Sequence, residues 1–311
     1  MSTDYQSGIL AAANSDAIFA TFNVTAQPQS LKQVRQVLAG IPALETDYRT
    51  HFAGADIHIT VAIGAAFWDR YCPGQRPRAL CAFPAMVDGD RQAPETPADL
   101  LLHIRSERHD LNYEIINRLV QQLGDSVSVL EEVHGFRYLD SRDLTGFVDG
   151  TENPEGEQRA IVALVGDEDV VFKGGSYLHL QRYEHDMTAW NAESIKQQED
   201  IIGRTKVDNV EYASAEKPVF AHTRRTSLKD SDGQSLEILR HSMPYGNLQR
   251  RGLMFAAFGR SPEPFTRMLA SMVKGDSEGH TDHLLKYTRA VTGQAFFAPS
   301  VAVLQAQGEV G

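Results

Sequence analysis

A carboxylate in a turn-rich stretch is the first candidate for chemistry in this sequence. Residues 146–154 read GFVDGTENP, which places Asp149 between an apolar segment and the turn-forming pairs Asp-Gly and Asn-Pro. Such pairs are common in turns, because glycine accepts a positive φ and an Asp or Asn side chain bonds its own backbone. A carboxylate beside a cavity can instead accept and return a proton. Asp149 is therefore the first candidate for a catalytic residue.

A histidine and an arginine further along the chain have unusual neighbours. His222 follows the apolar run 218–221 (PVFA), and Arg240 lies in the run 236–242, whose period of two places Arg240 and Ser242 on an otherwise apolar face. A haem iron requires a neutral imidazole beside apolar residues. A hydrogen-bonded structural histidine and a surface arginine are the common alternatives. The residues alone leave both interpretations open.

The spacing of these three residues is similar to that of a known family. Asp149 and His222 are 73 positions apart, and Arg240 follows His222 by 18. Together with the stretch 146–154, this spacing resembles the dye-decolourising haem peroxidases of bacteria, in which an aspartate, a ligating histidine and an arginine follow one another at similar separations. The chain is most similar to the compact members that lack a secretion signal.

The resemblance implies an enzyme with one haem b per chain. It would reduce hydrogen peroxide and oxidise dyes, phenols or other one-electron donors through a ferryl intermediate. His222 would ligate the iron, Asp149 would move a proton between the peroxide oxygens, and Arg240 would stabilise the charge that develops as the O–O bond breaks. Ser242 stands where some relatives have an asparagine and would be a third polar group beside the peroxide.

Further cofactor contacts follow from the same resemblance. Arg204 would meet a haem propionate, which suits its planar pair of donors. Asp282 would accept the ring N–H of His222 and so fix its tautomer. The cofactor contacts expected from the Asp149 loop are Gly150, Thr151 and Glu152.

Two other functions compete with this interpretation. A protein that stores or delivers haem or porphyrin, or recovers its iron, would bind the same cofactor with only incidental peroxidase activity. A haem-free binding module would require the spacing of the three residues to be coincidental. Nucleotide binding is disfavoured, because Gly174-Gly175 lacks the Lys-Ser/Thr of a phosphate loop. The pair His280 and His283 lacks the Glu of a His-Glu-x-x-His zinc motif.

The first half of the chain predicts the element order β-α-β-β-α-β. Alternating apolar residues indicate strands at 16–25 and 57–63, and apolar runs indicate strands at 99–105 and 126–133. Helical spacing at 31–41 and 111–123 supplies the two helices, and residues 73–97 are interpreted as a loop. This order is typical of a ferredoxin-like unit.

The second half is expected to repeat that order. Predicted strands are 159–165, 175–183 and the antiparallel pair 235–243 and 251–258, with helices at 187–203 and from 261 onward. We therefore expect an α+β fold of two ferredoxin-like halves, a domain at 1–134 and a haem-binding domain at 135–311.

Composition narrows the partners and the compartment. The chain of 311 residues has a net charge of −11 and no basic tract, which argues against nucleic acid and anionic membranes as partners. The N-terminus lacks a signal-peptide pattern, and no apolar run is long enough to span a membrane. Cys72 and Cys81 are too few for a disulfide framework and are interpreted as buried, so a cytoplasmic protein is expected. We also expect a homo-oligomer, a dimer or larger.

Overall fold

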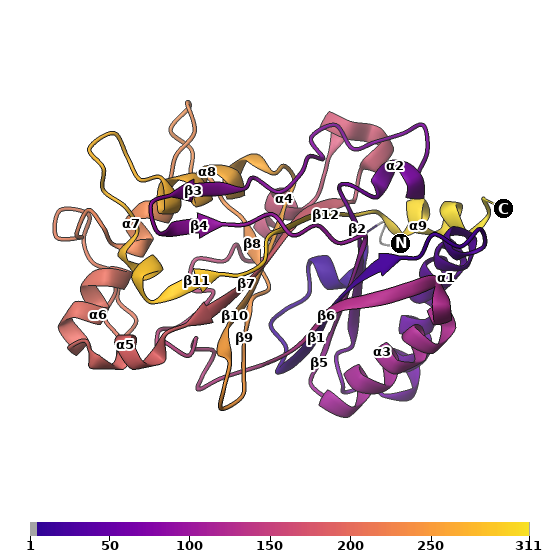
Figure 1. Ribbon diagram of the computed structural model, residues 1–311, viewed down its shortest axis with the longest axis horizontal. Coiled ribbons are helices and arrows are strands. Elements are labelled where there is room, and N and C mark those ends of the chain that lie inside the picture. Colours follow the sequence, from indigo (N-terminus) through magenta and orange to yellow (C-terminus); the bar gives the residue numbers. More distant parts are fainter. Residues whose placement is uncertain (1–4, 311) are drawn as a thin grey trace.

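The computed structural model describes residues 5–310. Most of the first half lies on one side of the molecule and most of the second half on the other, but residues 86–93 reach over to the second half and the C-terminal residues 301–308 lie beside residues 30–51 (Figure 1). The first half contributes four long strands and two long helices, namely β1 (Asp16–Val24), α1 (Ser30–His51), β2 (His58–Gly64), β5 (Leu100–Ser106), α3 (His109–Leu123) and β6 (Val127–Phe136). These strands lie in the spatial order β6-β1-β5-β2. Between β2 and β5 lie α2 (Trp68–Tyr71) and the hairpin of β3 (Met86–Asp88) and β4 (Arg91–Ala93).

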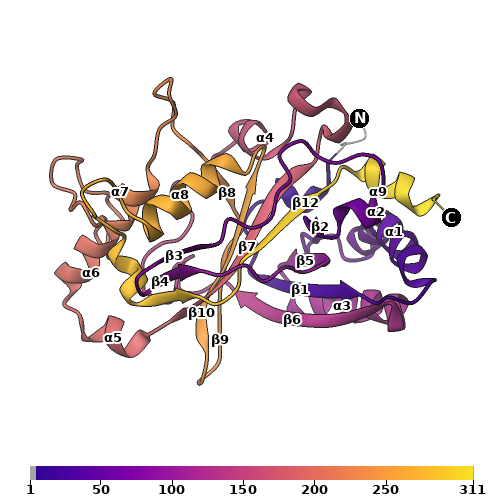
Figure 2. The same ribbon diagram turned by 45° about the horizontal axis from the view of Figure 1, so that its top comes forward.

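The second half is built around β7 (Ser176–His185) and β10 (Arg251–Gly259). Its remaining elements are α4 (Gln158–Ala163), α5 (Met187–Ala192), α6 (Ile195–Ile202), α7 (His222–Thr226), β8 (Leu239–Arg240), β9 (Met243–Gly246), α8 (Glu263–Val273), β11 (Thr288–Ala290), β12 (Gln294–Ala298) and α9 (Val301–Gly308). Its strands lie in the order β9-β10-β7-β12. The β3–β4 hairpin of the first half extends over the second half and packs on α8 and β11 (Figure 2).

The two sets of strands join into a closed ring. β12 pairs with β2, β6 pairs with β9, and β7 pairs with β10, so eight strands close on themselves in the order β7-β12-β2-β5-β1-β6-β9-β10. β1 is buried on both of its faces. Its Ile18, Ala20 and Phe22 face the core under α1 and α3, whereas Ala17 and Phe19 face the interior of the ring.

Several sequence expectations are wrong in the second half. Residues 159–165 were predicted as a strand, but 158–163 form the helix α4. The expected helix at 187–203 is two helices, because Glu193 is extended and Ser194 caps a new helix at Ile195. Of the strand expected at 235–243, only Leu239 and Arg240 of β8 and Met243 of β9 are in strands, and β9 continues to Gly246.

The 73–97 segment and the two cysteines differ in part from the sequence predictions. The loop expected at 73–97 contains the short β3–β4 hairpin. Cys72 is buried as predicted, but Cys81 is exposed, because it lies in the segment that leads into that hairpin. Among residues 5–310, no helix is long and apolar enough to cross a membrane. The predicted α+β composition is confirmed.

Candidate active site

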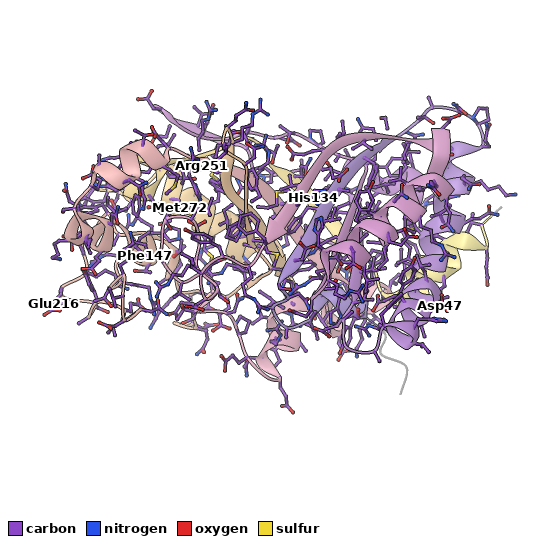
Figure 3. All side chains as sticks on the ribbon, turned by 90° about the horizontal axis from the view of Figure 1, so that it is seen from below. Asp47, His134, Phe147, Glu216, Arg251 and Met272 are labelled. Atoms are coloured by element: carbon purple, nitrogen blue, oxygen red, sulfur yellow. The ribbon has the colours of Figure 1, made fainter. Side chains whose placement is uncertain are left out.

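A cavity of about 370 Å³ lies in the second half of the molecule. Its walls come from the 143–152 loop, β7, α7, the segment 235–240, β10 and α8. Phe147 and Met272, which both line it, are labelled in the second half in Figure 3, far from Asp47 in the first. Much of the wall is apolar, as the side chains Ile238, Leu253, Phe255, Phe265, Met268, Leu269, Met272 and Leu284 show. The volume is within the range of about 300–1,000 Å³ that is usual for cofactor sites.

His222 lines this cavity and is held by a buried carboxylate. It is the first residue of α7, and its Nδ1 lies 2.6 Å from Oδ2 of Asp282, whose side chain is fully buried. The other carboxylate oxygen of Asp282 accepts a hydrogen bond from the backbone N–H of Leu284 at 2.9 Å. Because an ionised carboxylate only accepts, His222 carries its proton on Nδ1. Nε2 is therefore left with a free lone pair for a ligand.

Asp149 and Arg240 line the same cavity as His222. Burial raises the pKa of Asp149, and the positive charge of Arg240 lowers it by less, so the pKa lies above its ordinary value. Nε of Arg240 is buried and has no hydrogen-bond partner among the described residues. Such an orphaned donor is costly unless it meets a ligand or water. The pair thus offers a proton carrier beside a positive charge.

Asn153 ties the loop that contains Asp149 to the backbone of Arg240. Its side-chain amide donates to the carbonyl O of Arg240 and accepts from the backbone N–H of Arg240, both at 2.9 Å. The backbone N–H of Asp149 also bonds the carbonyl O of Ser141 at 2.9 Å. Sequence reasoning treated Asn153 only as part of a turn. Its contact with Arg240, 87 positions away, has no signal in the local pattern.

The other candidate residues are placed differently. Arg204 lines the cavity, but its Nη1 already donates to Glu152 at 2.8 Å and to Glu211 at 3.3 Å. Gly150, Thr151 and Glu152 also line the cavity, and Gly150 has a φ of +81°. The hydroxyl of Ser242 does not line it, and accepts a hydrogen bond from the backbone N–H of Ala256 at 3.3 Å.

Sequence reasoning missed a second polar group in the cavity wall. Asp143, Thr145, His185 and Thr288 line the cavity and are hydrogen-bonded to one another. The only signal in the sequence was a second aspartate six residues before Asp149.

Comparisons with known proteins identify the family of this chain. A sequence model described as Dyp-type peroxidase, C-terminal, matches residues 140–303, and one described as Dyp-type peroxidase, N-terminal, matches residues 6–137. The chain belongs to the Dyp-type peroxidase family. The family inferred from the Asp149, His222 and Arg240 spacing is thereby confirmed.

Individual relatives in the Dyp-type family span nearly the whole chain. The dye-decolorizing peroxidase of Mycobacterium tuberculosis is 39% identical over 95% of this chain and 88% of the relative. The crystal structure of a Dyp-type peroxidase protein from Shewanella oneidensis is 46% identical, with a TM-score of 0.95 over 98% of this chain and 99% of that one. A Rhodococcus jostii DypB variant in complex with heme is 39% identical, with a TM-score of 0.94 over 97% and 98%.

Proposed function

We propose that this Dyp-type peroxidase binds one haem b in the cavity and uses it to reduce hydrogen peroxide at the expense of one-electron donors such as dyes or phenols. The observation that carries the proposal is the convergence of two pairs in one cavity. His222, paired with Asp282, offers a free ring nitrogen, and Asp149, beside Arg240, offers a proton carrier. Structures of DypB in complex with heme, from the same family, support the choice of cofactor.

The residues present fit a haem. The apolar walls suit a porphyrin face, and His222 Nε2 is available to an iron. The buried, unpaired Nε of Arg240 is a donor that has no use without a ligand. When bound, the haem supplies an open coordination position and the capacity to store oxidising equivalents. Arg204 is proposed to hold a propionate, which would compete with Glu152 and Glu211 for its guanidinium.

Asp149 and Arg240 are proposed to share the chemistry of peroxide. Asp149, when ionised, accepts a proton from one oxygen of hydrogen peroxide and returns it to the other, so that water leaves. Arg240 stabilises the negative charge that develops as the O–O bond breaks. Two DypB variants in complex with heme support these assignments, because the arginine and the aspartate substituted in them are separated by 91 positions, as are Arg240 and Asp149.

Ser242 is proposed as a minor contributor. It stands two positions after Arg240, where a third DypB variant alters an asparagine. A serine hydroxyl is shorter than an asparagine amide, and that of Ser242 already accepts a bond from Ala256. Catalysis in this chain therefore depends mainly on Asp149 and Arg240.

We also infer that the two halves are ferredoxin-like domains at 1–134 and 135–311. Each half has its strands in the spatial order fourth, first, third, second, which supports this description. The last two residues of β6 extend past the boundary. A cytoplasmic location and a homo-oligomer remain part of the proposal. The two free cysteines favour a cytoplasmic location, and the cryo-EM structure of the encapsulated DyP-type peroxidase from Mycobacterium smegmatis is consistent with assembly.

A haem-handling role is the second candidate. It is favoured by a relative named deferrochelatase from Escherichia coli, which is 23% identical over 80% of this chain. Both functions predict haem binding, so only the reaction with peroxide separates them. A handling protein would react slowly, and loss of Asp149 would have little effect on it.

The decisive experiment reconstitutes the protein with haem and follows its reaction with hydrogen peroxide by stopped flow. The wild type is expected to show a five-coordinate histidine-ligated spectrum and a fast reaction. His222→Ala is expected to lose stable haem binding and to regain it in part with added imidazole. If His222→Ala keeps the histidine-ligated spectrum without imidazole, another residue is the ligand. If the wild type binds haem but reacts slowly, the handling role replaces the peroxidase.

A further inference from the structure

Two cavities meet at a wall made of His185 and Thr288. The inner cavity is the site that contains Asp149 and His222. The outer cavity, of about 400 Å³, is lined by the β3–β4 hairpin, the end of β7 and the segment that leads into β11. Its rim carries exposed side chains such as Asp90 and Arg289. His185 and Thr288 line both cavities, so they separate the inner cavity from the surface at this point.

The wall is a chain of hydrogen bonds that crosses from one cavity to the other. Oγ1 of Thr288 lies 2.7 Å from Nδ1 of His185, and Nε2 of His185 lies 3.2 Å from Oδ1 of Asp143. The other carboxylate oxygen of Asp143 accepts from the hydroxyl and the backbone N–H of Thr145, at 2.6 and 3.0 Å. The side chain of His185 is only 5% exposed. The two ring nitrogens of His185 thus have different partners, Thr288 and Asp143, within a buried wall.

We propose that Thr288, His185 and Asp143 form a proton relay from the outer cavity to Asp149. This inference rests on the proposed function. Nε2–H of His185 donates to Asp143, and Nδ1 accepts from the hydroxyl of Thr288. When Nδ1 takes a proton from the Thr288 side, the ring is cationic and can release its Nε2 proton to Asp143. Water in the inner cavity carries that proton from Asp143 to Asp149. The Thr288 hydroxyl regains a proton from water in the outer cavity, and a flip of the neutral ring again presents an N–H to Asp143 and a lone pair to Thr288.

The chemistry requires such a path. Reduction of hydrogen peroxide follows H2O2 + 2 H⁺ + 2 e⁻ → 2 H2O. A bulky phenol or dye that gives up its electron outside the cavity leaves its proton outside as well. Two protons per peroxide must therefore reach the buried site separately. Much of the rest of the inner wall is apolar, so the described titratable chain at His185 is suited to carry them.

At the inner end of the relay, the pKa values of Asp143 and Asp149 are shifted in opposite directions. Burial by itself raises the pKa of Asp143, but the hydrogen bond and charge of His185 and the bonds from Thr145 outweigh it, so the pKa lies below its ordinary value. Burial raises the pKa of Asp149, and the charge of Asp143 adds to the effect. Asp149 therefore holds a proton more tightly than Asp143 does.

The groups around His185 carry both signs of charge. Asp143 faces its inner side. Around the outer cavity stand Glu184, Asp186, Asp90, Arg91, Lys286, Tyr287 and Arg289. Some of these charges compensate one another, because Arg91 bonds Asp88, and Arg289 lies 3.6 Å from Glu184. The ionised partner in direct contact with the ring is Asp143, so the His185–Asp143 bond is the one to test.

Thr288 gives the sharper kinetic test, because Thr288→Val removes the hydroxyl at nearly constant shape, whereas Thr288→Ser keeps it. In the holoenzyme oxidising a bulky dye, Thr288→Val is expected to lower kcat about tenfold or more and to change its pH profile. Thr288→Ser is expected to restore both. The rate constant for the reaction with peroxide, which uses a proton already present in peroxide, should fall much less than kcat. Equal kcat and pH profiles in the two variants, or equal losses in both rate constants, would overturn the relay.

A second measurement needs neither haem nor turnover. His185→Gln keeps a hydrogen-bonding group in the wall but cannot carry a charge. NMR titration of the Asp143 carboxyl carbon in the apoprotein is expected to show a higher pKa in His185→Gln than in the wild type. An unchanged pKa would mean that the pair is not formed in solution, and the relay would fail. Failure of the proposed function has a different signature, because the reconstituted wild type itself would then not react with peroxide.

Discussion

The ionised carboxylate of Asp149 is expected to lower the free energy of unfolding at neutral pH. A folded-state pKa above the ordinary value means that the folded protein binds this proton more tightly than the unfolded chain does. This tighter binding of the proton stabilises the folded protein fully below the pKa of Asp149 in the unfolded chain, about 3.9. The stabilisation is lost as the pH rises through the pKa of Asp149 in the folded protein. In the apoprotein at pH 7, Asp149→Asn is therefore expected to raise the free energy of unfolding. The difference in free energy of unfolding between Asp149→Asn and the wild type should shrink as the pH falls.

Urea denaturation of the apoprotein at several pH values measures this effect. Asp232→Asn, which alters an exposed carboxylate, is the matched control and should change little at any pH. A stabilisation by Asp149→Asn that is independent of pH would show that Asp149 does not titrate above its ordinary range. Because Asp149 accepts the peroxide proton only when ionised, the raised pKa is expected to place the acid-side loss of the reaction with peroxide at a higher pH than an ordinary carboxyl would.

Arg240 is expected to act in the transition state more than in cofactor binding. Its Nε is buried without a partner, and loss of one preorganised donor commonly costs about 10²-fold to 10³-fold in rate. Arg240→Leu should therefore slow the reaction with peroxide by about that factor while haem is still bound. Arg251→Leu, on the exposed end of β10, makes the same change of charge and should react like the wild type. An unaffected rate in Arg240→Leu would leave Arg240 a structural residue.

The sequence predicted the residues that carry local or spacing signals, but not their electrostatics. Asp149, His222 and Arg240 could be placed in one site from their separations. The net pKa shift of Asp149 could not be predicted, because burial and Arg240 act in opposite directions and only the structure shows which is larger. Asp143 and His185 were missed, because their contact joins positions 42 apart and belongs to no motif.

At the scale of elements, Gly203 connects helix α6 to the histidine segment. It ends α6 with a φ of +88°, and a Cβ there would lie 2.3 Å from Oγ1 of Thr223 and 3.2 Å from Cβ of Ala221. Gly203→Ala is expected to cost about 1–3 kcal/mol from the backbone alone, and more from the clash. Because Ala221 and Thr223 flank His222, haem affinity should fall too.

Chemical denaturation and haem titration check this effect. Gly74→Ala is the matched control, because Gly74 has a φ of +85° but no atom within 4 Å of the added Cβ. It should show the backbone cost without the loss of haem affinity. If the two variants lose equal stability and bind haem equally, the contact with the histidine segment has no effect.

The elements themselves were predictable where the pattern was long. The strands and helices of the first half agree with their periodicity, since each has an extended apolar face. Residues 159–165 form a short apolar run, which fits a buried helix as well as a strand. The segment 235–243 is strand-like in pattern, but only Leu239, Arg240 and Met243 pair with β10. In residues 159–165 and 235–243, contacts with residues far along the chain determine the secondary structure.

At the scale of the whole molecule, the two halves are expected to unfold together. Trp68 in the first half packs against Phe172 and Phe297 of the second, and β12 of the second half pairs with β2 of the first. The chain has two tryptophans, Trp68 and Trp190, one in each half. In Trp68→Phe and in Trp190→Phe, the remaining fluorescence and the far-UV CD should give the same denaturation midpoint. Separate midpoints would indicate two independent domains.

The closed ring of strands also restricts how copies of this chain can meet. An open sheet offers unpaired N–H and C=O groups along its edge, onto which another chain can add as a further strand. Here the edge strands of this sheet in the described chain, β11 and β8, have only three and two residues and offer few such groups. β6 pairs with β1 along its length but with β9 only at Gly135, so most of its other side is unpaired. Addition of a strand from another copy is thus expected at this side of β6 rather than at β11 or β8, and substitutions on the outward face of β6 can alter assembly without loss of the fold.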